Sequence, residues 1–130
     1  MKRNVVFLLA CMFAMASALP ASAGSTKTLK DVLGRYFLVG AAMNVDQIWN
    51  RTPDETNVVK NNFNSIVAEN CMKGEEIHPE ENRFFWDDAD RFVKFGQDNG
   101  LAIIGHCLVW HSQPPVWMFT DERGDTVSRD

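Results

Sequence analysis

Apolar residues along the chain form two kinds of pattern. Three runs, at residues 37–42, 64–68 and 101–110, contain no charged side chain, which is typical of buried strands in a parallel sheet. Residues 53–63 and 86–99, between the runs, have the spacing of helices. The order strand, helix, strand, helix, strand predicts an α/β fold with parallel strands and right-handed crossovers.

The first crossover helix has sequence signals at its beginning. Thr52 can cap the helix, Pro53 suits the first helical position, and Glu55 lies three residues after Thr52, as in a capping box. We expect the helix to end near residue 63. Three of its side chains are expected to face the core: Val58, Val59 and Phe63.

The second crossover helix is predicted over residues 86–99, because Gly100 suits the position just after a helix. Its inner face would carry Ala89, Phe92, Val93 and Gly96. A shorter opening helix is predicted over residues 28–36. The polar segment 73–84 contains glycine and proline and is predicted to be a loop.

The first residues are typical of a targeting segment. Lys2 and Arg3 precede residues 5–16, which contain no charge, and an Ala-Ser-Ala pattern ends at Ala23. We interpret residues 1–23 as a signal peptide cleaved after Ala23, which predicts a secreted or periplasmic protein. The alternative is a lipoprotein anchored at Cys11, because Leu-Leu-Ala-Cys resembles a lipoprotein cleavage box.

Composition and charge exclude some classes of protein. The formal net charge of −4 argues against a nucleic-acid partner, which would require a basic face. The hydrophobic fraction of 45% is that of a globular protein rather than a disordered chain. Beyond the leader, Cys71 and Cys107 are too few for a disulfide scaffold, and they either pair or remain buried thiols.

The chain is short for the architecture that it predicts. Three strands and two crossover helices make an incomplete α/β sheet, whereas an eight-stranded barrel needs about 250 residues. Either residues 24–130 form a small open sheet, or they are part of a barrel. Polar residues at the predicted strand ends help to decide.

Ligands of α/β folds bind beyond the carboxyl ends of the strands, and two predicted strands end in polar residues. Strand alternation would place His106, Leu108 and Trp110 on one face. Directed hydrogen bonds and an aromatic face suit a sugar. The candidate substrate-binding residues are Glu69, Asn70, Lys73, His106, Trp110 and Gln113. Taken singly, Glu69 and Lys73 could be a surface ion pair, and His106 and Trp110 could belong to the core.

A metal site is the weaker alternative. It would use His106, His111, Cys71 and Cys107. The two histidines are five residues apart, so a strand would direct them to opposite faces, and no recognised metal-binding spacing accompanies them. We therefore expect no metal and no cofactor.

Three stretches, residues 63–73, 78–84 and 105–113, resemble glycoside hydrolase family 10 in order and spacing. The resemblance implies that the chain is the N-terminal portion, about three βα units, of a TIM (β/α)8 barrel. It implies an endo-β-1,4-xylanase as the full-length parent. Glu69, Asn70 and Lys73 would bind the xylose two units into the glycone side, His106 and Trp110 the xylose beside the scissile bond, and Gln113 the rim.

The same resemblance implies that the reaction centre lies elsewhere. The family is retaining and uses two glutamates, which the resemblance assigns to strands four and seven, downstream of residue 130. The acidic loop at Glu75, Glu76, Glu80 and Glu81 is expected to be solvated. We therefore expect a fragment, truncated after the third strand, that binds xylan or xylo-oligosaccharides and is inactive alone. The alternative is a non-catalytic carbohydrate-binding protein. The complete domain is expected to be monomeric.

Overall fold

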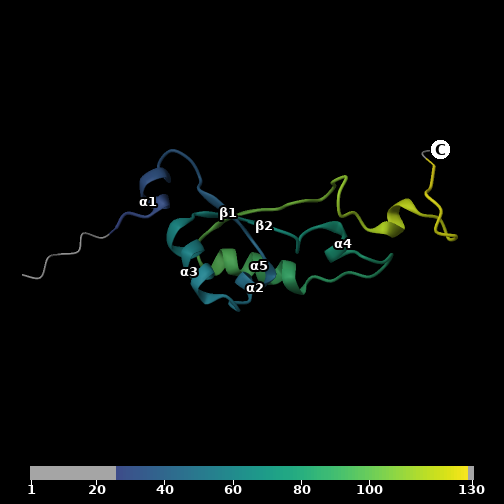
Figure 1. Cartoon of the computed structure of the whole chain (residues 1–130), viewed down its shortest axis with the longest axis horizontal. Coiled ribbons are helices and arrows are strands. Elements are labelled where there is room, and N and C mark those ends of the chain that lie inside the picture. The colour runs from purple at the N-terminus through teal and green to yellow at the C-terminus, as the bar shows by residue number, and fades with distance from the viewer. Residues whose placement is uncertain (1–25, 129–130) are drawn as a thin grey trace, which may run out of the picture.

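The computed structural model describes residues 26–128, so the predicted signal peptide and Cys11 lie outside the described residues. Within that range, three strands form one sheet in the order β1-β2-β3, and both pairs are parallel. The strands are β1 Gly40–Met43, β2 Ser65–Ala68 and β3 Ala102–Ile104. Helices α2, α3 and α5 lie on one side of the sheet, with α1 and α4 at opposite ends (Figure 1). The predicted parallel β/α order is confirmed.

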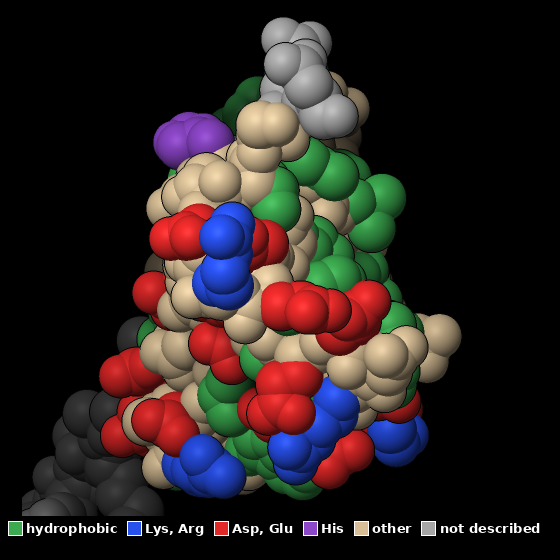
Figure 2. Space-filling model, turned by 90° about the vertical axis from the view of Figure 1, so that its right-hand side faces the viewer, with side chains coloured by type: hydrophobic (Ala, Val, Ile, Leu, Met, Phe, Trp, Pro, Cys, Tyr) green, Lys and Arg blue, Asp and Glu red, His purple; other side chains and the backbone are tan. Residues whose placement is uncertain are grey.

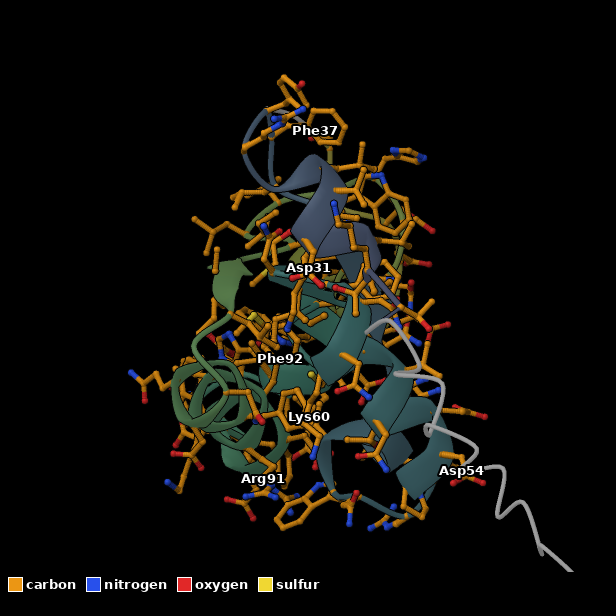
Figure 3. All side chains as sticks on the ribbon, turned by 90° about the vertical axis from the view of Figure 1, so that its left-hand side faces the viewer. Asp31, Phe37, Asp54, Lys60, Arg91 and Phe92 are labelled. Carbon is orange, nitrogen blue, oxygen red and sulfur yellow. The ribbon has the colours of Figure 1, made fainter. Side chains whose placement is uncertain are left out.

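The core lies between the sheet and α5, which spans Asp87–Asp98. Phe92 is completely buried, together with Met43, Ile48 and Ile66. Figure 3 shows Phe92 projecting from α5 into the interior. The predicted inner face is confirmed, with Val93 only partly buried, and Gly100 after the helix has the positive φ of 63° that favours glycine.

Helix α3 covers Pro53–Asn62 with Pro53 at its first position, as predicted. The predicted capping box is wrong, because Thr52 makes no side-chain cap and Glu55 accepts a bond from Gln47 at 2.8 Å. The prediction that Val58 faces the core is also wrong, since Val58 is 55% exposed. Thr56 is buried in its stead, and its hydroxyl donates to the backbone oxygens of Gln47 and Thr52.

The N-terminal boundaries also differ from the prediction. Helix α1 covers only Leu29–Leu33, and β1 begins at Gly40 rather than at residue 37. Pairing explains the late start, because Gly40 is the first residue to face a partner, Ser65. Phe37 lies beyond that pairing and is exposed at the edge of the molecule (Figure 3).

The third strand is much shorter than the predicted residues 101–110. It ends at Ile104, which is the last residue paired with β2. Without further pairing, residues 105–115 follow an irregular path that leads to the 3-10 helix η1, Val116–Phe119. The sequence pattern was misleading here because an apolar run does not distinguish a strand from an apolar loop.

Two short α-helices were not predicted. Helix α2, Val45–Ile48, begins with a capping box. The side chains of Asn44 and Gln47 each accept a hydrogen bond from the backbone N–H of the other residue. Helix α4, Gly74–Ile77, lies in the segment predicted to be a loop, and Lys73 precedes it as the N-cap residue. None of the helices in residues 26–128 is long and apolar enough to cross a membrane.

Candidate functional site

The site is built by two segments that leave neighbouring parallel strands. Asn70 and Lys73 follow β2, and His106, Trp110 and Gln113 follow β3. Because β2 and β3 are parallel and paired, both segments leave the same edge of the sheet. This is the edge at which α/β folds bind ligands.

Lys73 is the centre of the cluster. Only 7% of it is exposed, and its ammonium donates to Asn70 Oδ1 at 2.8 Å and to Gln113 Oε1. The same nitrogen lies 5.0 Å from the centroid of the Trp110 ring. A buried cation needs such partners to offset its lost hydration, so these contacts hold the ammonium in a defined place.

Gln113 connects the two segments a second time. Its side-chain amide donates to Glu75 Oε1 at 2.6 Å, and its backbone oxygen accepts from the Glu75 N–H at 3.2 Å. Gln113 has a positive φ of 55°, a conformation that is costly for a residue with a Cβ. Glu75, expected to be only a solvated loop residue, is therefore a structural partner of the site that the sequence analysis missed.

His106 and Trp110 are near each other, with ring centroids 5.7 Å apart. Strand alternation, which was predicted to bring them to one face, is not the reason, because neither residue is in a strand. Leu108, predicted to share their face, is fully exposed. The loop after β3 brings the two rings together, and the Trp110 ring also lies 5.2 Å from that of His111.

Glu69 lies apart from the Lys73 cluster. It is exposed and lines a cavity of about 430 Å³ together with Asn70, Asn44 and Arg51. The ion pairs found in residues 26–128 do not join Glu69 to Lys73, so the surface ion-pair interpretation fails. Asn70 belongs both to this cavity, which it lines, and to the Lys73 cluster, where it accepts a hydrogen bond from Lys73.

The two cysteines are free thiols, with Cys71 buried and Cys107 partly buried. Burial raises the pKa of the Cys71 thiol to about 11, and the nearby charges of Asp88 and Glu76 add to the effect. Across residues 26–128, no group of three or more His, Cys, Asp or Glu side chains could hold a metal ion.

These residues are equipped to bind a neutral, hydroxyl-rich ligand. Amide oxygens, an ammonium and an indole ring together match the hydroxyls and C–H faces of a sugar. The arrangement is therefore suited to holding a sugar.

Comparisons with known proteins identify one family. The sequence profile described as glycosyl hydrolase family 10 matches residues 28–129. The chain is 53% identical over 120 residues to endo-1,4-beta-xylanase A of Xylanibacter ruminicola, covering 92% of this chain and 32% of that protein. It is 40% identical over 94 residues to endo-1,4-beta-xylanase B of Paenibacillus barcinonensis, covering 72% and 27%.

Solved structures show the same relationship. A psychrophilic family 10 endo-beta-1,4-xylanase superposes with a TM-score of 0.71 at 42% identity, covering 79% of this chain and 31% of that one. A mutant enzyme in complex with xylotriose superposes at 0.66 with 32% identity, covering 72% and 28%. The chain thus spans a third or less of the length of these relatives.

The parallel sheet, its crossover helices and the polar strand ends define a β/α type of protein. The chain belongs to glycosyl hydrolase family 10. The expected fold class, the N-terminal portion of a TIM barrel, is confirmed by the superposition on family 10 xylanases.

Proposed function

We propose that this chain is the N-terminal part of a retaining endo-β-1,4-xylanase. In that enzyme it supplies the surface that binds the glycone side of xylan, meaning the sugars on the non-reducing side of the broken bond. The observation that carries the proposal is the buried Lys73 ammonium held among Asn70, Gln113 and Trp110 in a family 10 chain. The named relatives are xylanases, which supports xylan as the substrate.

Each site residue has a role in this proposal. Glu69, Asn70 and Lys73 would bond the hydroxyls of the xylose two units from the scissile bond. His106 and Trp110 would hold the xylose beside that bond, and Gln113 would close the rim. Asn70 supports the grouping of the first three residues, because it lines the same cavity as Glu69 and accepts a hydrogen bond from Lys73.

The proposal requires two further carboxyl groups outside residues 1–130. A retaining glycosidase uses an acid/base and a nucleophile with carboxyl groups about 5–5.5 Å apart. Residues 26–128 would bind and orient the sugar, and sequence beyond this chain would supply both glutamates.

The test uses the protein expressed from its complete reading frame with β-1,4-xylan. Proton NMR of the first products should show the β-anomer, because two displacements restore the configuration of the β-linked substrate. An initial α-anomer would overturn retention, and the absence of any hydrolysis would overturn the enzyme assignment.

Residues 24–130 alone provide a second test. We expect no release of reducing sugar and association into larger species, because Ile104, Val109 and Val116 are among many exposed apolar side chains. Size-exclusion chromatography and a thermal melt would measure this. A monomer with a sharp unfolding transition that binds xylan would instead identify a non-catalytic carbohydrate-binding protein.

Secretion belongs to the same proposal and is supported by the sequence alone. The charged start, the apolar residues 5–16 and the Ala-Ser-Ala pattern favour cleavage after Ala23 and export. N-terminal sequencing of the exported protein should begin at Gly24. A lipid-modified Cys11 at the N-terminus would instead establish a membrane-anchored lipoprotein.

A further inference from the structure

A second cavity adjoins the one that Glu69 lines. It has a volume of about 500 Å³, which lies in the range of ligand sites, and Trp49 and Phe85 are two of its wall residues. Arg51, Cys71 and Glu76 line both cavities. The two cavities are therefore neighbours across a common wall, next to the residues proposed to bind the glycone.

Trp49 is held as a fixed aromatic surface in the wall of this cavity. Its indole N–H donates to Asp88 Oδ1 at 2.6 Å. The Arg91 guanidinium lies over the ring, 5.3 Å from its centroid, and is itself held because its Nε donates to the Ile48 oxygen at 3.0 Å. Trp49 is nevertheless 42% exposed. A ring that is held at one edge and covered on one face has its other face available for stacking.

Phe85 adds a second aromatic surface. Phe85 is 44% exposed, and its backbone N–H donates to the Ile77 oxygen at 2.8 Å. The Arg83 guanidinium lies 4.6 Å from the ring centroid. Trp49 and Phe85 thus offer two aromatic surfaces in the wall of one cavity, and a sugar can stack its C–H face on such surfaces.

The charges around the cavity indicate a neutral ligand. Its lining contains four carboxylates: Glu75, Glu76, Asp87 and Asp88. The lining cation, Arg51, is already paired with Asp46 at 2.9 Å. Figure 2 shows several Asp and Glu side chains, with Lys and Arg side chains among them, on the face of the molecule that it presents. Carboxylates can accept bonds from sugar hydroxyls, whereas they repel an anionic ligand.

We propose that the Trp49–Phe85 cavity is an outer glycone subsite that stacks a neutral pentose unit of xylan beyond those bound at Glu69 and Asn70. The proposal rests on the proposed xylanase function. It predicts that longer neutral substrates gain affinity from this cavity. A uronic acid on the same unit would cancel the gain through repulsion by the four carboxylates.

The experiment measures kcat/KM on xylo-oligosaccharides of increasing length with the protein from the complete reading frame. Trp49→Ala should lower kcat/KM about three- to tenfold on long substrates and leave short ones unchanged, since an aromatic contact of this kind is modest. Trp49→Phe should restore most of the loss. Tyr36→Ala is the matched control, because Tyr36 is also exposed with an arginine over its ring but directly follows α1, where its N–H donates to the Leu33 oxygen.

The outcomes separate this inference from the proposed function. If no xylan is hydrolysed by the unaltered protein, the proposed function fails and the subsite fails with it. If xylan is hydrolysed but Trp49→Ala has no effect, or affects short and long substrates equally, the subsite alone is overturned. Should Trp49→Ala unfold the protein, Phe85→Ala provides the same comparison. A substrate with a glucuronic acid at its non-reducing end should show no difference between the unaltered protein and Trp49→Ala.

Discussion

The Lys73 ammonium lies 5.0 Å from the centroid of the Trp110 ring, although the two residues follow different strands. Asn70 and Gln113 hold that ammonium by hydrogen bonds from either segment. The cation thus joins the loop after β2 to the loop after β3. A substitution of Lys73 should consequently shift the side chains that contact its ammonium, in addition to removing a positive charge.

Replacement of Lys73 by methionine should damage activity more than stability. The variant keeps the apolar stem and loses two charge-assisted hydrogen bonds, so kcat/KM of the complete enzyme should fall about 10- to 100-fold. Lys94→Met is the control, because Lys94 is exposed and only pairs with Asp98 in the same helix. Equal effects of the two variants on xylan hydrolysis would contradict a binding role for Lys73.

Trp110→Ala should also act on catalysis rather than on folding. Trp110 is 39% exposed and lies in a loop, so its removal leaves the core around Phe92 unchanged. Loss of a residue that positions substrate should lower kcat/KM about 10- to 100-fold. Activity and the melting temperature are measured on the same sample. A large fall in melting temperature with normal activity would show that Trp110 is a core residue of the complete barrel.

Glu69→Gln should lower kcat/KM on short xylo-oligosaccharides more than on polymeric xylan. Short substrates depend on every glycone hydrogen bond, whereas a long chain keeps its remaining contacts. The amide preserves the shape of the side chain, and the exposed position of Glu69 predicts little change in stability. Kinetics on xylotriose and on xylan would make the comparison. Equal losses on both would remove Glu69 from the proposed subsite.

Gly96→Ala should destabilise the protein even though alanine favours helices. A Cβ at Gly96 would lie 2.5 Å from Ile103 Cγ1 and 3.2 Å from Ile66 Cδ1, where α5 packs on the sheet. Such overpacking costs about 1–3 kcal/mol of unfolding free energy. Gln97→Ala, at the exposed next position, is the control and should be neutral or slightly stabilising. Urea unfolding of both variants would decide, and a more stable Gly96→Ala would show that α5 can move away from the sheet.

Cys71 should resist alkylation in the native protein. Its pKa is raised to about 11, chiefly by burial, so at pH 8.5 nearly all of the thiol is protonated, and the thiolate is the reactive form. Iodoacetamide at that pH should modify the less buried Cys107 first, as measured by mass spectrometry of the peptides. Both cysteines should react in urea. Rapid native modification of Cys71 would mean that the segment after β2 opens readily.

Much of this protein follows from sequence alone, because the responsible signals are local. Pro53 at a helix start, Gly100 after a helix and the spacing of Ala89, Phe92 and Gly96 each predicted what the structure contains. The alternation of strands and helices predicted the parallel sheet for a similar reason. Local steric rules and the burial of one helix face do not depend on distant residues.

Tertiary structure decided where the strands stop and how the site residues meet. The run at residues 101–110 has no charge anywhere, yet only Ala102–Ile104 pairs as a strand, because a strand extends only as far as its neighbour supplies hydrogen bonds. His106 and Trp110 meet through a loop rather than through strand alternation. Glu75 meets Gln113, and Trp49 meets Asp88, across 38 and 39 positions of sequence. Such contacts depend on the packing of whole segments, which no local pattern encodes.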